Sequence, residues 1–403
     1  MEKAGALTAE VAVVGGGPAG LTAAVALASA GVDTIVIAPP HRPDNRTTAL
    51  LAGSVAALDA LGVWPLCQAY AAPLAALRIV DDRGGLLRAP DVTFHASEIG
   101  LPAFAHNVEN RRLMDALTAR ARDFPALRMV EAAATDIDVD DSGVTLRLAD
   151  GRTVRARLAI GADGRDSLCR SAAGIEVERW SYPQTALTCN VRHDRPHRDT
   201  STEFHTAAGP FTLVPLPGLQ SSLVWVAKPA EAERLAGLSD DAFSLAVERH
   251  AHSLLGKMQV VSGRALFPLG GQSARRFAAR RIVLIGEAAH LIPPIGAQGF
   301  NLGLRDAATI AELVVATRRS GGDPGERALL ERYDRMRQVD VRARTFAVDL
   351  LNRSLLADFL PLQGARGLAL ALLDRIGPLR RAVMREGVTP RANEPRLMRG
   401  EAL

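Results

Sequence analysis

The sequence predicts an α/β protein in which a mainly parallel sheet is interrupted by a second sheet and followed by a helical C-terminal tail. Three observations support this fold class. An apolar run ends in a glycine-rich turn that opens an Ala-rich helical segment, as in the first half of a βαβ unit. A middle region has several strand-like runs but no such turn. The chain from Glu331 onward has helical character.

The βαβ unit comes first in the chain. Glu10–Val14 is apolar and β-branched, Gly15–Gly17 interrupts it, and Ala19–Ala30 is rich in Ala and Leu. Gly31 is placed to end this helix, and Thr34–Ile37 forms the second strand. Because both strands are continuously apolar, we expect a parallel sheet that is covered on both faces.

The remaining elements are predicted from alternation, helical spacing and turn residues. In chain order they are a hairpin of Leu74–Val80 with Leu86–Ala89, a helix at Arg112–Phe124, three strands within Arg128–Ile160, strands at Thr185–Val191, Phe211–Pro215 and Ser221–Ala227, one helix at Ser239–His252, a buried strand at Arg281–Ile285, a helix at Phe300–Thr317, and a helical tail with a break at Gly377–Pro378.

Composition narrows the functional class. The 403 residues are 48% hydrophobic and 23% charged, which is typical of an ordinary globular protein. The net charge is +4, and the residues from Leu351 to the end, with nine arginines and five acids, account for all of it. Aromatic residues are only 4% of the chain, so nucleic-acid binding on a stacking platform is not expected. An anionic membrane surface or an acidic partner near the C-terminus fits this charge better.

The cysteines and the N-terminal residues indicate the cellular compartment in which the protein is expected. Cys67, Cys169 and Cys189 have no CxxC spacing, so we expect no disulfide framework and no metal site. Neither a secretory signal nor a membrane-spanning apolar segment is recognisable. These features predict a protein of a reducing compartment, the cytoplasm.

The first motif, GGGPAG, extends from Gly15 to Gly20 between the first strand and the first helix. In a Rossmann-like unit, Gly15 permits the tight turn, Gly17 lets the backbone approach a pyrophosphate, and Gly20 allows close helix–strand packing. The helix N-terminus favours an anion by about 0.3–2 kcal/mol. The alternative is a glycine-rich turn without a ligand.

One expected feature of a dinucleotide site is missing. An acid at the end of the second strand usually accepts hydrogen bonds from the adenosine ribose. Here that place reads Ile37-Ala38-Pro39. This disfavours NAD as the ligand but is compatible with FAD, whose ribose could be held by backbone and water or by a nearby group such as Arg46.

Two further motifs follow later strands. Gly161–Arg170 contains the pair Asp163-Gly164, which either holds a polar ligand or forms a plain β-turn. Ile285–Asp306 contains a strand end, a proline-stiffened loop and glycines that open a helix near Gly299. Small residues at 296, 297 and 299 would let a flat ring lie close to the backbone, and the helix start would stabilise negative charge on it. Alone, His290 would be structural, and Arg305 and Asp306 could form a local ion pair.

These three motifs, in this order and spacing, resemble those of FAD-dependent aromatic hydroxylases with the para-hydroxybenzoate hydroxylase fold, from end to end of the chain. Ala49–Trp64, Pro294–Asp306 and Asp349–Arg385 are similar to stretches of the ubiquinone-biosynthesis hydroxylase family. The resemblance implies FAD as cofactor, NAD(P)H as cosubstrate, and hydroxylation of a polyprenylated phenol by a C4a-hydroperoxyflavin. It leaves open the same chemistry on a small soluble aromatic, or a flavin-binding accessory protein of a biosynthetic complex.

The resemblance also implies a domain organisation. We expect a discontinuous, Rossmann-like FAD-binding domain formed by residues 1–72, 103–180 and 268–340. Residues 73–102 and 181–267 would form the substrate-binding sheet domain, and residues 341–403 the C-terminal helical region.

Residue roles are likewise implied by the resemblance. The pyrophosphate would lie on Gly15, Gly17 and Gly20, with Arg46 and Arg111 near it and the ribose. Asp163 would lie between FAD and the nicotinamide route, and Glu287, after Gly286, would bond the ribitol chain. No catalytic acid, base or nucleophile is predicted. The complete set of predicted cofactor-binding residues is Gly15, Gly17, Pro18, Ala19, Gly20, Arg46, Arg111, Asp163, Gly286, Glu287, Pro293, Gly296, Ala297, Gln298 and Gly299.

The tail has a basic amphipathic character. Apolar residues are interleaved with arginines, namely Leu368, Leu370, Leu372, Leu373, Ile376 and Leu379 with Arg375, Arg380, Arg381 and Arg385. Such a surface could rest peripherally on the inner membrane or on a ubiquinone-biosynthesis partner and admit a prenyl chain. The alternative is a helix that packs on the FAD domain with solvated arginines.

Overall fold

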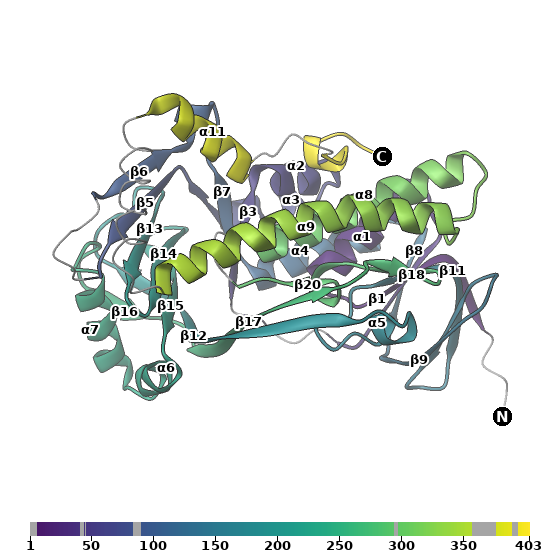
Figure 1. Cartoon of the computed structure of the whole chain (residues 1–403), viewed down its shortest axis with the longest axis horizontal. Coiled ribbons are helices and arrows are strands. Elements are labelled where there is room, and N and C mark those ends of the chain that lie inside the picture. The colour runs from purple at the N-terminus through teal and green to yellow at the C-terminus, as the bar shows by residue number, and fades with distance from the viewer. Residues whose placement is uncertain are drawn as a thin grey trace.

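The computed structural model describes residues 6–40, 44, 46–83, 90–293, 297–356, 376–388 and 394–403. Two large sheets and one small sheet are arranged along an elongated molecule, with long helices across the top of the first sheet (Figure 1). Among helices in these ranges, none is both long and apolar enough to cross a bilayer.

The first sheet has a parallel core, as predicted. Its parallel strands, in spatial order, are β19 (Ile282–Leu284), β11 (Thr153–Gly161), β1 (Leu7–Val14), β2 (Thr34–Ala38) and β8 (Leu127–Glu131). Antiparallel strands β18 (Ala278–Ala279), β10 (Val144–Leu148) and β9 (Ala134–Val139) extend it. The predicted three strands within Arg128–Ile160 are therefore four, because the chain leaves the parallel core after Glu131 and turns into a hairpin.

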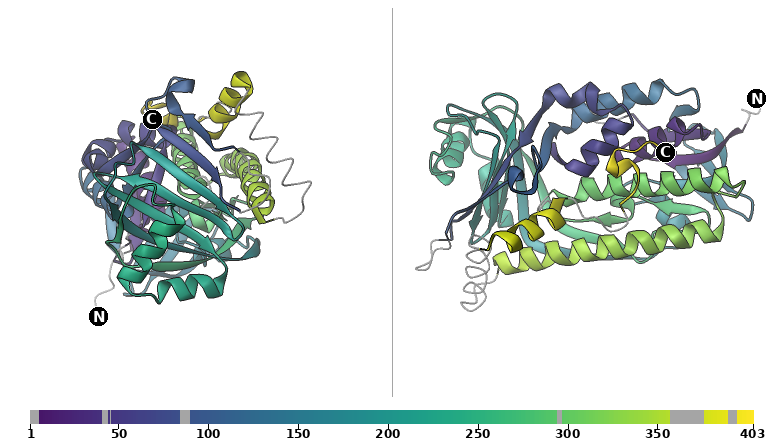
Figure 2. Two further views of the ribbon diagram at one scale, coloured as in Figure 1. Left: turned by 90° about the vertical axis from the view of Figure 1, so that its left-hand side faces the viewer. Right: turned by 90° about the horizontal axis from the view of Figure 1, so that it is seen from above.

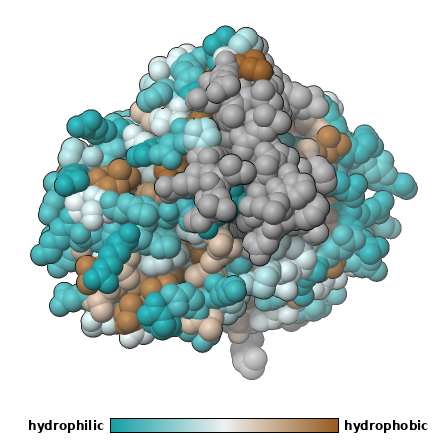
Figure 3. Space-filling model, turned by 60° about the vertical axis from the view of Figure 1, so that its left-hand side comes forward, coloured by the Kyte–Doolittle hydropathy of each residue, from teal (hydrophilic) through white to brown (hydrophobic). Residues whose placement is uncertain are grey.

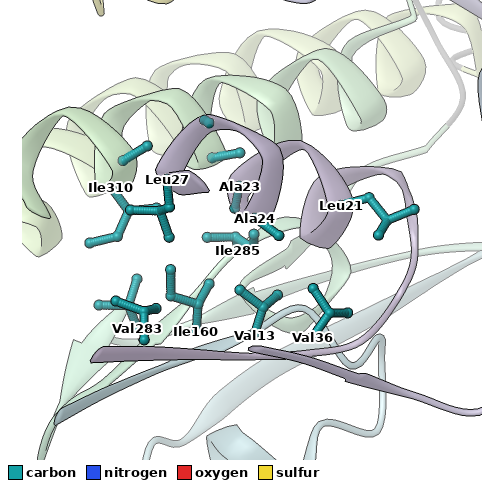
Figure 4. Packing of buried hydrophobic residues seen from close by; sticks show 14 of the residues in the cluster. Val13, Leu21, Ala23, Ala24, Leu27, Val36, Ile160, Val283, Ile285 and Ile310 are labelled. Carbon is teal, nitrogen blue, oxygen red and sulfur yellow. The ribbon is translucent and has the colours of Figure 1, made fainter. Parts of the chain in front are cut away.

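Helices cover the parallel core. They are α1 (Pro18–Ser29), α4 (Asn110–Arg122), α5 (Leu168–Ala172), α8 (Gln298–Arg319) and α9 (Arg327–Leu356). Figure 4 shows side chains of four parallel strands directed toward α1, namely Val13, Val36, Ile160 and Val283. Helix α1 is nearly all apolar because it lies between this sheet and α8.

The second sheet is mostly antiparallel. Its main path is β20 (His290–Leu291), β17 (Ala265–Ala274), β12 (Val177–His193), β15 (Gln220–Ala227), β14 (Gly209–Leu216), β13 (Thr200–Thr206), β5 (Ala76–Asp81) and β6 (Val92–His95), and β16 (Met258–Val260) pairs with β12. Helices α6 (Pro229–Ala236) and α7 (Asp240–His250) cover one face, where Phe243 of α7 packs with Phe211 and Trp225 of the sheet. The sequence predicted α7 alone, and it placed the partner of the first hairpin strand at Leu86–Ala89, which lies outside the described residues.

A small third sheet, not predicted, lies between the two large ones. It consists of β3 (Thr47–Leu51), β7 (Ala105–Glu109) and β4 (Ala71–Leu74), and α2 (Ala52–Ala60), α3 (Trp64–Cys67) and the short turn η1 (Gln68–Tyr70) connect its strands. The Thr47 hydroxyl lies 2.8 Å from that of Ser222, and the Asn107 amide donates to the Pro215 carbonyl at 2.9 Å. These bonds attach the second sheet to the small third sheet. The domain boundaries given above stay a prediction.

The C-terminal region is only partly helical. Helix α11 (Gly377–Val388) begins at the predicted Gly-Pro break and lies against β6 and the short turn η2 (Ala96–Ile99). The last described residues then return to the parallel-sheet side, where η4 (Leu397–Arg399) packs on α2 (Figure 2). Leu397 and Met398 are buried in the main core, so this end of the chain is part of the fold.

Candidate functional site

The first two motifs are in direct contact. Strands β1 and β11 are parallel neighbours, so the turns that follow them leave the same edge of the sheet. Gly15 has φ +115°, and a Cβ atom built on it would lie 2.2 Å from the Ala162 carbonyl oxygen. A Cβ atom on Gly20 would lie 2.1 Å from the Gly15 carbonyl oxygen. Both glycines are therefore required by close backbone approach.

The third motif meets the first at the start of α1. The short turn η3 (Gly286–Ala288) follows β19, and Gly286 adopts φ +57°. A Cβ atom on Gly286 would lie 3.3 Å from that of Ala19. A Cβ atom on Gly303 of α8 would lie 3.3 Å from the Ala19 Cβ and the Gly286 Cα. The three motifs thus converge at the carboxyl edge of the parallel sheet.

The first turn fits a pyrophosphate. Gly17 is the residue before α1, and a Cβ atom built on it would meet nothing within 4 Å, whereas those of Gly15 and Gly20 would collide with backbone. The first turn of α1 contains Pro18 and no acidic residue. Open space beside Gly17 and a helix N-terminus without a competing carboxylate suit an anionic cofactor.

The Asp163 carboxylate stabilises the loop of the second motif through hydrogen bonds. One of its carboxylate oxygens accepts the Ser167 hydroxyl at 2.6 Å, and the other accepts the Cys169 amide at 3.0 Å. The Ser167 hydroxyl in turn accepts the Arg170 amide at 2.9 Å and caps α5. These bonds fix the loop and leave Gly164, at φ +81°, in open space.

Charged side chains of the second and third motifs, and of the segment before β3, lie close to one another. A Glu287 carboxylate oxygen lies 3.7 Å from the Arg165 guanidinium. The Arg46 guanidinium donates hydrogen bonds to the Asp44 carboxylate at 2.8, 2.9 and 3.1 Å, and it lies 4.9 Å from the Phe267 ring centre. Burial alone would raise the pKa of Asp44, but hydrogen bonds, chiefly from Arg46, outweigh burial and lower that pKa to about 2.

The other predicted residues are distributed as follows. Arg111 contacts Glu109 at 3.1 Å and is half-exposed, and no described contact joins it to the glycine-rich turn. Pro293 is described, whereas Gly296 lies outside the described residues. Ala297 has φ +55° and precedes α8, which begins at Gln298 and includes Gly299. Arg344 of α9 donates to the Gln298 side-chain oxygen at 2.8 Å.

A buried charge network supports the third motif. Asp306 accepts hydrogen bonds from the Gly286 amide at 2.9 Å, from His290 at 2.6 Å and from Arg337 at 2.6 Å. Burial alone would raise the pKa of Asp306, but His290 and Arg337 outweigh burial and lower it. His290 is therefore structural, as its isolated position suggested.

Arg305 pairs with other carboxylates and not with its neighbour Asp306, so the alternative of a local ion pair is wrong. Its guanidinium lies 3.6 Å from Asp340 and 3.4 Å from Glu394. Successive side chains on a helix point about 100° apart, so adjacent residues face different neighbours.

Sequence reasoning missed two contributors to this region. Gln272 of β17 donates to the carbonyls of Arg165 at 3.3 Å and Glu287 at 3.2 Å, which joins the second sheet to two of the motifs. Gly303 allows α8 to approach Ala19, and its place in the apolar helix was a signal of close packing. A Gln inside a strand gives no comparable signal.

Comparison with known proteins identifies the family. A family model described as "FAD binding domain" matches residues 8–345. Ubiquinone hydroxylase UbiL of Rhodospirillum rubrum is 38% identical over 98% of this chain and 94% of its own length. The chain belongs to the ubiquinone-biosynthesis hydroxylase family of FAD-dependent monooxygenases. It is an FAD-dependent aromatic hydroxylase, and the glycine turns described above fit its cofactor.

Other members and solved structures agree with this family. The 3-demethoxyubiquinol 3-hydroxylase of Escherichia coli is 32% identical over 93% of this chain and 97% of its own length. The p-nitrophenol 4-monooxygenase PnpA of Pseudomonas putida superposes with a TM-score of 0.79 at 20% identity, covering 96% of this chain and 99% of PnpA. At that identity the likeness to PnpA shows the fold alone.

Proposed function

We propose that this ubiquinone-family hydroxylase acts on the aromatic ring of a polyprenylated phenol in ubiquinone biosynthesis, with NAD(P)H and O2 as cosubstrates. The observation that carries the proposal is the convergence of three glycine-bearing turns beside the second sheet. The names of the relatives in Rhodospirillum rubrum and Escherichia coli support the substrate class.

The chain's own residues would hold FAD, which supplies the redox and oxygen chemistry when bound. The α1 amides after Gly17 would bind the pyrophosphate, and Glu287 would accept from the ribitol chain. Backbone amides at the start of α8, from Ala297 to Gly299, would face the flavin ring. Arg344 holds the Gln298 side chain at 2.8 Å and would thereby orient the start of α8 toward the ring.

The substrate ring would lie against the face of the second sheet that is opposite α6 and α7. Ser222 and Asn190 on that face contact Thr47 at 2.8 Å and Glu109 at 3.5 Å, so the face is turned toward the small third sheet. Register pairs place further side chains there, among them the half-buried Thr188, Thr212, Val214 and Val224. A mixture of methyl groups and hydroxyls suits a phenol and would exclude bulk water.

A direct test compares two substrates with the purified, FAD-loaded protein. One is a prenylated phenol and the other is the same phenol without its chain. We expect NAD(P)H oxidation coupled to a hydroxylated product only with the prenylated phenol. Equal hydroxylation of both would favour a small soluble aromatic, and FAD binding without hydroxylation of either would favour an accessory role.

We also propose a peripheral contact of the C-terminal region with the inner membrane. Within α11 and the residue before it, Val383 and Ile376 are 49% and 43% exposed, and Arg381 is exposed. Arg380 is not part of that surface, because it donates to Glu98 at 2.7 Å. Leu368–Leu373 and Arg375 lie outside the described residues. Among the residues that Figure 3 colours by hydropathy, most on this side of the molecule are hydrophilic, and the apolar areas are small and separate.

Liposome binding tests the membrane contact. Deleting the whole tail would also remove Leu397 and Met398 from the core, so point substitutions are preferable. We expect the double variant Ile376→Glu, Val383→Glu to lose binding to anionic vesicles. Leu245→Glu, at a 45% exposed site on α7, is the matched control. Binding that survives the double substitution would show that this surface does not contact the membrane.

A further inference from the structure

The end of β2 lacks the acid that the adenosine ribose of a dinucleotide usually meets. Ala38 is the last residue of β2, and a Cβ atom on Gly16 would lie only 2.7 Å from the Ala38 Cβ. Ala38 therefore borders the glycine-rich turn, where a carboxylate accepts from the ribose hydroxyls in other dinucleotide folds. Its methyl group cannot accept a hydrogen bond.

The neighbouring strand supplies an acid at the same level of the sheet. Ala38 pairs with Glu131, which is the last register pair between β2 and β8. Side chains alternate along a strand, so Ala38 lies on the same face as Val36, which points toward α1 in Figure 4. Register partners in parallel strands share a face, so Glu131 lies on the α1 side as well. Adjacent strands are about 4.8 Å apart, a gap that a glutamate side chain can span.

The other carboxylates of this region are already engaged. Asp163 accepts from Ser167 and the Cys169 amide. Asp44 accepts from Arg46 and from the Asn110 amide group at 2.8 Å. Glu287 lies 3.7 Å from Arg165.

Glu131 differs from these three acids. It is exposed, and within the described part of the chain its side chain has no hydrogen bond or ion pair. It is therefore an available acceptor at the edge where the first turn opens.

We propose that Glu131 accepts hydrogen bonds from the adenosine ribose of FAD and replaces the acid that is missing from β2. The proposal rests on FAD binding at the α1 turn and does not depend on the identity of the phenol. It makes Glu131 a cofactor-affinity residue without a part in the chemistry.

The test measures FAD affinity by titrating flavin-free protein and following flavin fluorescence. We expect Glu131→Gln to raise the Kd for FAD roughly tenfold, the effect of losing one charge-assisted hydrogen bond. Glu233→Gln, at an exposed site on α6, should leave the Kd unchanged. An unchanged Kd for the Glu131→Gln variant would overturn the proposal.

An FAD analogue that lacks both adenosine ribose hydroxyls shows whether Glu131 contacts these hydroxyls or whether its substitution weakens FAD binding indirectly. The unmodified protein should bind the analogue about tenfold more weakly than FAD, and Glu131→Gln should bind both alike. If removing the hydroxyls and substituting Glu131 each weaken binding independently, so that the two fold-changes in Kd multiply, the carboxylate does not contact the ribose. Adding Ala38→Glu to Glu131→Gln should recover the affinity for FAD, and failure to do so would remove the claim that one acid replaces the other.

Discussion

The Nε2 atom of His290 lies 2.6 Å from an Oδ2 atom of Asp306, and both side chains are excluded from solvent. The same oxygen accepts the Gly286 amide, while the other oxygen accepts Arg337. One carboxylate on α8 thus fixes the turn after β19, the start of β20 and α9. The position of Gly286 against α1 depends on this junction.

Replacing Asp306 with Asn should destabilise the protein strongly. The amide can satisfy only some of the three donors, and it removes one of the two carboxylates that pair with the buried Arg337, the other being Asp340. We expect the free energy of unfolding to fall by about 3–5 kcal/mol, measured by urea denaturation. Asp115→Asn, at an exposed site on α4, is the control. A loss no larger than that of the control would show that the junction is not important for stability.

Asp340 gives the stability a defined pH dependence. Burial alone would raise its pKa, but Arg337, Arg344 and Arg305 outweigh burial and lower the pKa from 3.8 to about 2. A lowered folded-state pKa stabilises the protein above pH 3.8, by about 2 kcal/mol, and this contribution is lost as the pH falls toward 2. Unfolding free energies of the unmodified protein and Asp340→Asn should therefore converge over this window. A gap that stays constant would contradict the assignment.

The sequence predicted the parts of the fold that depend on local patterns. The β1 strand, the Gly15–Gly20 turn and α1 follow from neighbouring residues, and so does the start of α8 near Gly299. The small third sheet was missed because β3 and β4 are four or five residues long and pair only through β7, far along the chain.

The candidate site shows the same division. The glycines at which a Cβ atom would collide with neighbouring backbone were predicted, because they are part of a short motif that can be recognised in the sequence. The partners of Asp306 were not, since Arg337 is 31 residues away and reaches it only after α8 and α9 pack together. Glu131 was missed for a related reason: the register between β2 and β8, and not the sequence, places it beside Ala38.

A bulky side chain on the proposed substrate face should block hydroxylation and spare the cofactor. Val224 is half-buried and lies between Thr188 and Thr212 in the sheet. We expect Val224→Trp to lower the hydroxylation rate more than tenfold while the bound flavin keeps its visible absorption. Leu245→Trp on α7 should change neither quantity. Normal turnover by Val224→Trp would place the phenol elsewhere.

The three cysteines should be unreactive in the native state. All three are buried, and burial raises the pKa of Cys67 to about 11 and that of Cys189 to about 12. The thiolate is the reactive form, so labelling with a disulfide reagent near pH 8 should be slow. Three thiols should react promptly once the chain is unfolded. Rapid labelling of the folded protein would mean that these sites open more readily than their packing indicates.

Transfer of an oxygen atom from O2 to a prenylated phenol can be followed by isotope labelling. The FAD-loaded protein is supplied with NADPH, the phenol and isotopically heavy O2, and the product is weighed by mass spectrometry. Oxygen transfer predicts one heavy oxygen atom in a new ring hydroxyl. NADPH consumption with the phenol recovered unchanged, or a product without the label, would contradict it.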